Sequence, residues 1–265
     1  MLIETVGNYA SMSSVGASII YADAMNSISQ GRRYNLGLAT GNTMITLYEE
    51  LAAKFNAARA DLSLLSTWNL DEYSTDGTAS VPHDHPLSYW KYMHEKLFSK
   101  FDPALGFDPA NAHFPDPVDS ASYDPAIAAA GGLDLQLLGI GFNGHIAFNE
   151  PGSALTSRTR MVSLTPQTIK DNARFFKKAS DVPQYALSMG VGSIMEAKKV
   201  ILLAFGKNKA AAVAAAVEGG VSQFCTASAL QMHQDAWFFC DEEAASKLKL
   251  KKYYAWRAEG ELARA

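Results

Sequence analysis

The sequence predicts an α/β protein with a Rossmann-like, three-layer fold, in which helices flank a mainly parallel sheet. Short apolar runs alternate with longer segments of helical period, which is typical of successive βα units. The chain has 265 residues and is 48% hydrophobic, so it can bury one substantial core. No repeat, low-complexity tract or flexible linker interrupts it. We therefore expect residues 1–265 to form a single domain.

Each expected element is a segment whose apolar pattern fits a strand or a helix. The expected strands are residues 34–39, 64–70, 133–140, 200–205 and 236–240. The expected helices are residues 15–29, 43–55, 88–101, 125–130, 207–218 and 242–248. The Pro- and Asp-rich stretch 102–119 indicates a surface connection, and the lysines at 247, 249, 251 and 252 indicate a solvated helix face.

Composition argues against several classes of partner. The 23 basic and 27 acidic residues give a net charge of −4, which provides no electrostatic case for nucleic acid or an anionic membrane surface. Cys225 and Cys240 form no CxxC pair, and their apolar surroundings indicate buried thiols rather than a metal site or a disulfide. The chain opens with no signal-like segment, and no apolar run approaches the ~20 residues that span a bilayer. We expect a cytoplasmic protein.

The residues that carry chemistry follow the expected strands, where the ligand crevice of a doubly wound sheet lies. After the first strand, Thr40, Gly41, Asn42 and Thr43 lead into a helix. Free backbone N–H groups and the positive end of the helix dipole could hold a phosphate there. The loop lacks the lysine and the spacing of a Walker loop, and Thr43 as a simple N-cap is the alternative.

The second and fourth strands also end in charged residues. Asp71 and Glu72 point in opposite directions if the strand stays extended, so only one of them can face the crevice. Asp71 is the first residue beyond the apolar run and is our candidate base; a carboxylate that caps the following loop is the alternative. Lys207 and Lys209 follow the fourth strand and supply cations for a phosphate, unless they are only a surface pair.

The third strand is followed by the segment GIGFNGHIAFNEPG, residues 139–152. Its opening matches GxGxxG, but a dinucleotide fingerprint also needs a following helix and an acid ~20 residues further on. Here a proline–glycine turn follows and no acid lies between Glu150 and Asp171, so we reject a nicotinamide site. We expect the glycines to let the backbone approach a ligand, and His145 and Glu150 to converge across the turn. A structural histidine is the alternative.

Taken together, these segments resemble the glucosamine-6-phosphate deaminase family over nearly the whole chain. The resemblance is carried by LGLATGNT (36–43), NLDEY (69–73), HPLSY (85–89), GHIAFNEP (144–151), SRTR (157–160), RFF (174–176) and YALSMGVG (185–192). The GHIAFNEP run is highly specific. The related 6-phosphogluconolactonases share the fold and a Gly-His pair, but they resemble this chain much less after that histidine.

The resemblance implies catalytic roles for four residues. Asp71 is expected to move a proton between sugar carbons, and His145 is expected to assist ring opening while Glu150 orients it. Asn143 occupies the place in this relay where many members carry an acid, and we expect activity to survive the change. An imidazole suits ring opening because it titrates near neutrality.

The resemblance also implies how substrate is held. The phosphate of a hexosamine 6-phosphate is expected to bind the loop of residues 40–43 together with Arg174 and Lys209. This grip would supply the binding energy that orients the sugar. The expected chemistry needs neither a metal nor an organic cofactor.

The sequence departs from the family pattern at the phosphate loop and after the second strand. Asn42 and Met44 replace the usual Gly and Pro of the loop, which could alter its shape. The loop of residues 74–84 is longer than usual, and its function is left open. His83 and His85 give it a superficial metal-binding spacing, but with only two imidazoles we do not expect a metal site.

Regulation is less clearly implied than catalysis. Some members are activated by an N-acetylated sugar phosphate at a subunit interface. Arg160 and Ser153 match residues of that site, whereas Ala154 and Val162 replace polar or charged ones, so we do not expect allosteric control. Residues 165–178, which include Arg174, are expected to act as a lid because they are polar and follow the active segment.

The sequence leaves alternatives open. Galactosamine 6-phosphate is a second candidate substrate, because the two sugars differ at one carbinol. A 6-phosphogluconolactonase is another enzymatic interpretation, and a non-catalytic sugar-phosphate sensor is an interpretation of a different class. Such sensors usually carry a DNA-binding segment, which the early first strand and the acidic charge do not favour. Oligomeric state, including a homo-oligomer, is left open.

Overall fold

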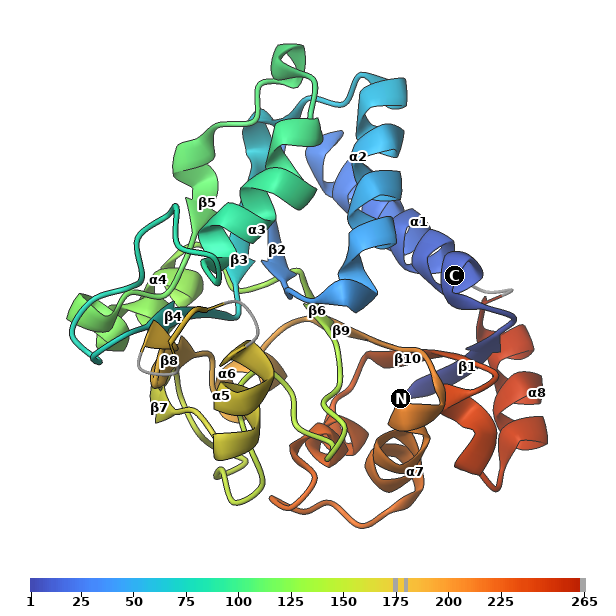
Figure 1. The fold of residues 1–265 in the computed structure, drawn as a ribbon. Helices are drawn as coiled ribbons and strands as arrows, with labels where there is room; N and C mark the ends of the chain where they lie inside the picture. Colours follow the sequence, from blue (N-terminus) through green and yellow to red (C-terminus); the bar gives the residue numbers. More distant parts are fainter. Residues whose placement is uncertain (174–175, 179–180, 263–265) are drawn as a thin grey trace.

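The computed structural model describes residues 1–173, 176–178 and 181–262, and it confirms the α/β fold class. Within these residues seven strands form a parallel sheet with the order β1-β10-β9-β6-β2-β3-β5 (Figure 1). They are β1 (Leu2–Val6), β2 (Tyr34–Leu38), β3 (Leu65–Asn69), β5 (Ala112–His113), β6 (Leu135–Leu138), β9 (Lys199–Ala204) and β10 (Ala236–Asp241). Each of the expected strands is one of these.

Helices cover the faces and one edge of this sheet. They are α1 (Tyr9–Ile28), α2 (Ile45–Ala58), α3 (Tyr89–Lys96), α4 (Tyr123–Ala129), α5 (Pro166–Asn172), α6 (Val191–Met195), α7 (Ala210–Glu218) and α8 (Lys251–Leu262). The Asn8 side chain accepts the N–H of Ser11 at 2.9 Å and so caps the start of α1. α1 packs on α2 and crosses β1, β2, β9 and β10, while α8 lies along β1 and covers that edge of the sheet.

A second, antiparallel sheet of three strands lies beside the first. It has the order β4-β8-β7, formed by β4 (Asp71–Ser74), β8 (Tyr185–Ser188) and β7 (Arg160–Ser163). The chain passes between the sheets at one residue: the Leu70 N–H donates to the Leu38 carbonyl at 3.1 Å, while the Leu70 carbonyl accepts the Met189 N–H at 2.7 Å. Asp71 is therefore the first residue of the second sheet, held where the two sheets meet.

The strand order locates the point where a ligand crevice is expected. From β2 the chain proceeds through β3 to β5 on one side, and from β6 through β9 to β10 on the other. Neighbouring β2 and β6 therefore send their following loops apart at their carboxyl ends, which opens the crevice of a doubly wound sheet. The loops after both strands carry residues that the sequence singles out.

Some expected elements differ from the structure. The expected helix at 242–248 is a 3₁₀ segment, Ala244–Lys247, and the sequence prediction missed α8. It also missed β1, because a five-residue run with polar residues inside it gives a weak signal; pairing in parallel register with β10 stabilises this strand. Cys225 and Cys240 are both buried and free, as expected.

Candidate active site

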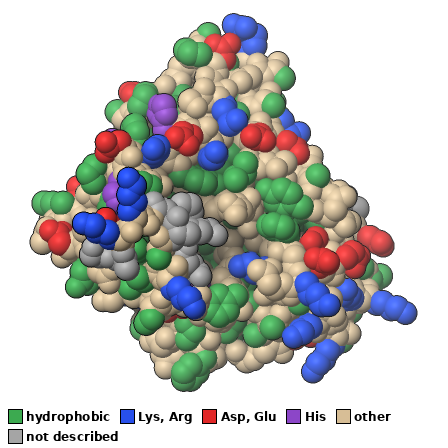
Figure 2. Space-filling view, viewed as in Figure 1, with side chains coloured by type: hydrophobic (Ala, Val, Ile, Leu, Met, Phe, Trp, Pro, Cys, Tyr) green, Lys and Arg blue, Asp and Glu red, His purple; other side chains and the backbone are tan. Residues whose placement is uncertain are grey.

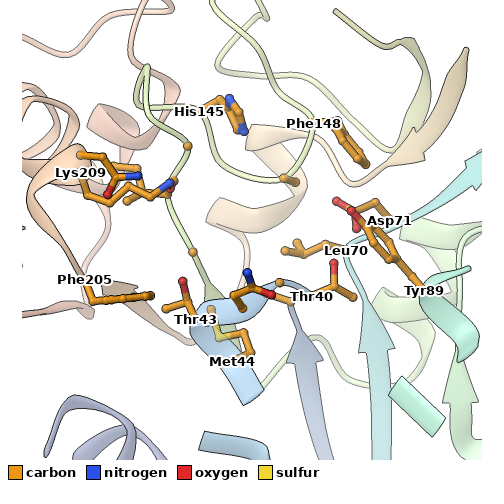
Figure 3. Close-up of a pocket in the computed structure, with 18 residues that line it drawn as sticks. Thr40, Thr43, Met44, Leu70, Asp71, Tyr89, His145, Phe148, Phe205 and Lys209 are labelled. Atoms are coloured by element: carbon orange, nitrogen blue, oxygen red, sulfur yellow. The ribbon is translucent and has the colours of Figure 1, made fainter. Parts of the chain in front are cut away.

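A cavity of about 440 Å³ opens at the carboxyl ends of the parallel strands. Its walls are the segments after β2, β3, β6 and β9, which are the strand ends where the sequence predicts chemistry. In the space-filling view the hollow lies near the centre of the face (Figure 2). Figure 3 shows Asp71 and Lys209 on opposite sides of the cavity, with His145 on a third side. Residues far apart in the chain thus face one space.

The loop after β2 presents backbone donors to this cavity. Gly41 has φ 116° and ψ 167°, a conformation that favours glycine, and it begins the 3₁₀ turn Asn42–Met44 that runs into α2. In the described part of the chain the N–H groups of Asn42 and Thr43 have no hydrogen-bond acceptor. Because they also lie at the positive end of α2, this loop can bind an anion.

Lys209 brings a cation to the same cavity. Gly206 turns the chain after β9, and the 3₁₀ segment Lys207–Lys209 comes next. The Lys209 ammonium donates to the Ile140 carbonyl at 2.7 Å, and burial lowers the pKa of Lys209. Lys207 is exposed and does not line the cavity. The structure therefore separates the two lysines: only Lys209 is placed to meet a phosphate in the cavity.

The adjacent acids after β3 diverge. Asp71 lines the cavity although its residue is only 6% exposed; burial, and then the charge of Glu72, raises the pKa of Asp71 well above its usual range. Glu72 instead accepts the backbone N–H groups of Tyr89 and Trp90, each at 2.9 Å, and so anchors the start of α3. One acid faces the ligand space and the other holds a helix.

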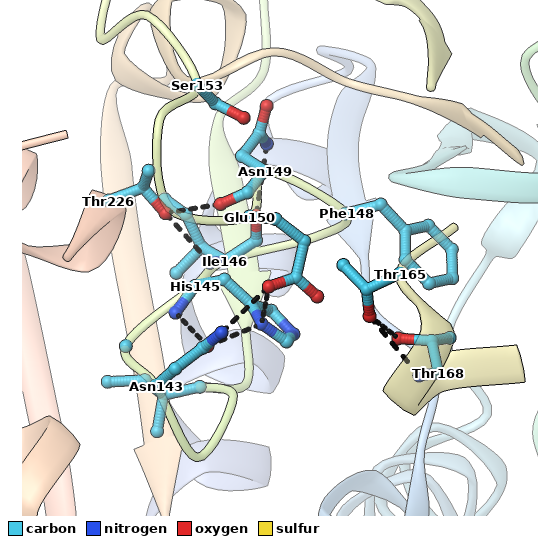
Figure 4. A network of polar contacts seen from close by, with 12 residues as sticks. Asn143, His145, Ile146, Phe148, Asn149, Glu150, Ser153, Thr165, Thr168 and Thr226 are labelled. Atoms are coloured by element: carbon cyan, nitrogen blue, oxygen red, sulfur yellow. Dashed lines mark hydrogen bonds and ion pairs between the residues drawn. The ribbon is translucent and has the colours of Figure 1, made fainter. Parts of the chain in front are cut away.

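His145 is fixed by a side-chain network that Figure 4 shows. The Asn143 Nδ2 donates to Glu150 Oε2 at 2.7 Å, which directs the amide oxygen of Asn143 to His145 Nδ1, also at 2.7 Å. Glu150 Oε2 lies 3.3 Å from the same Nδ1. Since neither oxygen can donate, Nδ1 carries a hydrogen and the neutral ring keeps Nε2 available as a proton acceptor.

The loop around His145 depends on glycine at the position beneath the ring. A Cβ on Gly141 would lie 2.3 Å from His145 Cε1, closer than such contacts allow. Ala147, which lines the cavity just beyond His145, has φ 50°, a strained conformation for a residue with a Cβ. The GxGxxG-like run therefore forms a tight turn that positions the imidazole. No helix begins within residues 139–152.

Glu150 has an environment unlike that of Asp71. Burial alone would raise the pKa of Glu150, but the hydrogen bond and charge of His145, and the Asn143 amide, outweigh it, so its pKa is lowered. The carboxylate form is thus the stable one. It is suited to stabilise a positive charge on the imidazole when His145 takes up a proton.

Sequence reasoning missed residues that support the site. Asn149 is fully buried, and its amide donates to the carbonyls of Ile146 and Met189 at 3.0 and 2.9 Å. The Thr226 hydroxyl donates to the Asn149 carbonyl at 2.8 Å and joins a distant segment to the His145 loop. Tyr89 also lines the cavity. The HPLSY segment contained Tyr89, whereas no local pattern marks Thr226.

Several predicted residues lie outside this geometry. Arg174 falls outside the described residues, so its phosphate contact and much of the expected lid stay predictions. Arg160 does not line the cavity; its guanidinium donates to Asn149 Oδ1 at 2.9 Å and to the Ser153 hydroxyl at 3.2 Å. The His83 ring stacks on Trp90 at 3.9 Å between centroids. Among the described residues no group of three or more His, Cys, Asp or Glu side chains could hold a metal.

The fold is α/β, and the cavity combines a lysine with backbone N–H groups that have no acceptor among the described residues, which suits a small anionic ligand. A family model described as glucosamine-6-phosphate isomerases/6-phosphogluconolactonase matches residues 8–239. The chain therefore belongs to this family.

Similar proteins cover nearly the whole chain. A protein of Shewanella loihica named glucosamine-6-phosphate deaminase is 44% identical over 100% of this chain and 97% of its own length. One of Rhodococcus opacus with the same name is 45% identical over 93% of both. A solved structure described as a monomeric glucosamine-6-phosphate deaminase has 36% identity and a TM-score of 0.83, covering 93% of this chain and all of its own.

More distant structures share the fold. The 6-phosphogluconolactonase of Trypanosoma cruzi matches with a TM-score of 0.72 at 20% identity, over 94% of this chain and 97% of its own. This likeness concerns the fold alone. In the part of the chain that the structure describes, no helix is both long and apolar enough to cross a bilayer.

Proposed function

We propose that residues 1–265 form a single cytoplasmic domain that converts glucosamine 6-phosphate and water into fructose 6-phosphate and ammonia. One observation carries the proposal: a buried carboxylate, Asp71, and an imidazole of fixed tautomer, His145, line the same cavity as an anion-binding loop and Lys209. The names of relatives that are 44–45% identical over 93–100% of the chain support the same reaction.

Ring opening is the first step of the proposed mechanism. A proton must leave the anomeric hydroxyl at C1, and a proton must reach the ring oxygen as the C1–O bond breaks. His145 Nε2 accepts the first proton and can supply the second. The imidazolium that forms in between is stabilised by Glu150, and Asn143 holds Nδ1–H in position.

Proton transfer between C2 and C1 comes next. Asp71 removes the proton from C2, the electron pair forms the C1–C2 double bond of an enolamine, and the aldehyde oxygen takes up a proton. Asp71 then returns its proton to C1, and the nitrogen gives up a proton that balances the one taken up by the aldehyde oxygen, which leaves an imine at C2. The raised pKa of Asp71 makes its carboxylate a stronger base for this weakly acidic C–H group.

Hydrolysis completes the reaction. Water adds to the imine carbon, ammonia leaves, and a ketone remains at C2, so that no external oxidant or reductant is required. The substrate phosphate binds the loop of residues 40–43 and Lys209, away from the reacting carbons. Arg174 is a further predicted phosphate ligand. This grip orients C1 and C2 between His145 and Asp71.

Ammonia release tests the proposal directly. Purified protein, with a chelator present, is expected to release ammonium from glucosamine 6-phosphate; galactosamine 6-phosphate is assayed in parallel, because it differs at one carbinol. 6-Phosphogluconolactone serves as the control for a lactonase. Folded protein that releases no ammonia from either sugar, or that hydrolyses only the lactone, contradicts the proposed function.

A further inference from the structure

The phosphate loop is held by two tyrosines that do not line the cavity. The Tyr92 hydroxyl of α3 donates to the Gly41 carbonyl at 2.7 Å, and the Tyr9 hydroxyl at the start of α1 donates to the Asn42 carbonyl at 2.9 Å. Neither tyrosine belongs to the cavity wall. Two successive carbonyls of the loop thus accept hydroxyl groups from residues outside the cavity wall.

Peptide geometry connects these contacts to anion binding. In a trans peptide the C=O and the following N–H point in opposite directions, and the described chain contains no cis peptide. The Gly41 carbonyl accepts the Tyr92 hydroxyl and also the Met44 N–H, the latter at 3.0 Å, so the Asn42 N–H points the opposite way. The Asn42 carbonyl points to the Tyr9 hydroxyl, so the Thr43 N–H points away from Tyr9 in the same manner. Neither of these two N–H groups has an acceptor among the described residues.

Both tyrosines are themselves anchored. Glu72 accepts the N–H groups of Tyr89 and Trp90 and so fixes the first turn of α3, which carries Tyr92. The Tyr9 ring packs on Phe205, a cavity residue, with 4.6 Å between centroids. Contacts from both α1 and α3 therefore hold the loop. The contact from α3 depends on Glu72, which is next to Asp71 in the chain.

We propose that Tyr9 and Tyr92 are positioning residues for phosphate. Each hydroxyl holds the carbonyl of one peptide and so orients the N–H at the other end of that peptide. Tyr92 orients the Asn42 N–H in this way, and Tyr9 orients the Thr43 N–H. The inference rests on the proposed function in that the anion is the substrate phosphate.

The test uses Tyr92→Phe, Tyr9→Phe and the double variant of the full chain. Each single variant is expected to weaken binding of inorganic phosphate, measured by calorimetry, by about three- to tenfold, the effect of one orienting hydrogen bond. The KM for glucosamine 6-phosphate rises by a similar factor while kcat stays within about twofold, because binding remote from C1 and C2 is lost equally in ground and transition states. The double variant shows the larger loss.

Tyr21→Phe is the matched control. Tyr21 lies twelve residues further along α1, about 18 Å away, and its ring packs on Phe55. Unchanged phosphate affinity in both single variants overturns the inference, and so does a loss of kcat equal to the rise in KM. If the wild-type protein releases no ammonia, the proposed function fails, but phosphate calorimetry on the same variants still decides the role of the tyrosines.

Discussion

Asp71, which lines the cavity, and Glu150, which lies behind the cavity residue His145, are held in opposite ways. Asp71 stands at the start of a strand, buried between two sheets beside a second acid, and its pKa is raised. Glu150 lies on a glycine-rich loop with its side chain 20% exposed, bound to an amide and an imidazole, and its pKa is lowered. Burial thus disfavours the charged form of Asp71, whereas hydrogen bonding and the charge of His145 favour the charged form of Glu150.

This difference indicates which carboxylate suits which task. A carboxyl group that is costly to ionise gives a strong base once it is ionised. Removal of a C–H proton requires such a base. A carboxylate that stays ionised is suited to hold a histidine in one tautomer and to offset its positive charge. The Asp71 side depends on burial and the His145 side on the shape of a loop, so each can be broken by a different kind of substitution.

The largest expected effect comes from Asp71→Asn. An amide of the same size keeps the packing but cannot accept the C2 proton, so turnover should fall by a factor on the order of a hundred or more while phosphate still binds. Ammonia release and calorimetry with phosphate measure the two effects. Asp76→Asn, at an exposed loop carboxylate, is the control and should leave turnover unchanged. Normal turnover in Asp71→Asn would remove this residue from its proposed role.

The next effect tests the loop side through its backbone. Gly141→Ala places a methyl group where the His145 ring lies, which must displace the imidazole from Asn143 and Glu150. A displacement of about 1 Å can cost on the order of a hundredfold in kcat. Gly260→Ala, whose new Cβ meets no atom within 4 Å, is the matched control. If both variants keep the wild-type kcat, turnover does not depend on the position of the His145 ring.

The sequence predicts the parallel sheet and its chemistry-bearing strand ends because both depend on local features. Buried parallel strands have continuous apolar sequences, and the residues directly after each strand lie at the same edge of the sheet. The segments at Thr40, Asp71, His145 and Lys209 could therefore be assigned to one cavity from the sequence alone.

Contacts between distant segments could not be predicted in this way. β4 pairs with β8 across more than a hundred residues, and nothing in DEYS marks a change of sheet at Leu70. The hydroxyl of Tyr92 reaches Gly41 from 51 residues away, and Thr226 reaches Asn149 from 77. Such partners are set by how helices and loops pack together, which a local pattern does not contain.

Asn143→Asp places a second carboxylate, besides Glu150, next to His145. The new charge beside His145 Nδ1 stabilises the protonated imidazole. Since a protonated ring cannot accept the anomeric proton, kcat/KM should fall at the acid end of its pH profile relative to the wild type. Asn208→Asp, at another residue of the cavity wall, controls for added charge. A profile that moves equally in both variants would contradict the direct effect on His145.

The smallest expected effect is a gain in stability from Asp71→Asn. The folded-state pKa of Asp71 is raised above the unfolded value of about 3.9, so ionisation costs folding free energy, and this cost grows as pH rises from the unfolded pKa to the folded one. The amide avoids that cost. The variant's Tm should exceed that of the wild type at pH 8 by a few degrees, at about 2–4 °C per kcal/mol, and the difference should vanish below about pH 4.

Asp76→Asn is the control and should give no gain, because hydrogen bonds from Thr78 lower the pKa of that exposed carboxylate. Melting curves across this pH range measure the effect, and a Tm difference for Asp71→Asn that is independent of pH would mean that the carboxylate charge is not its cause.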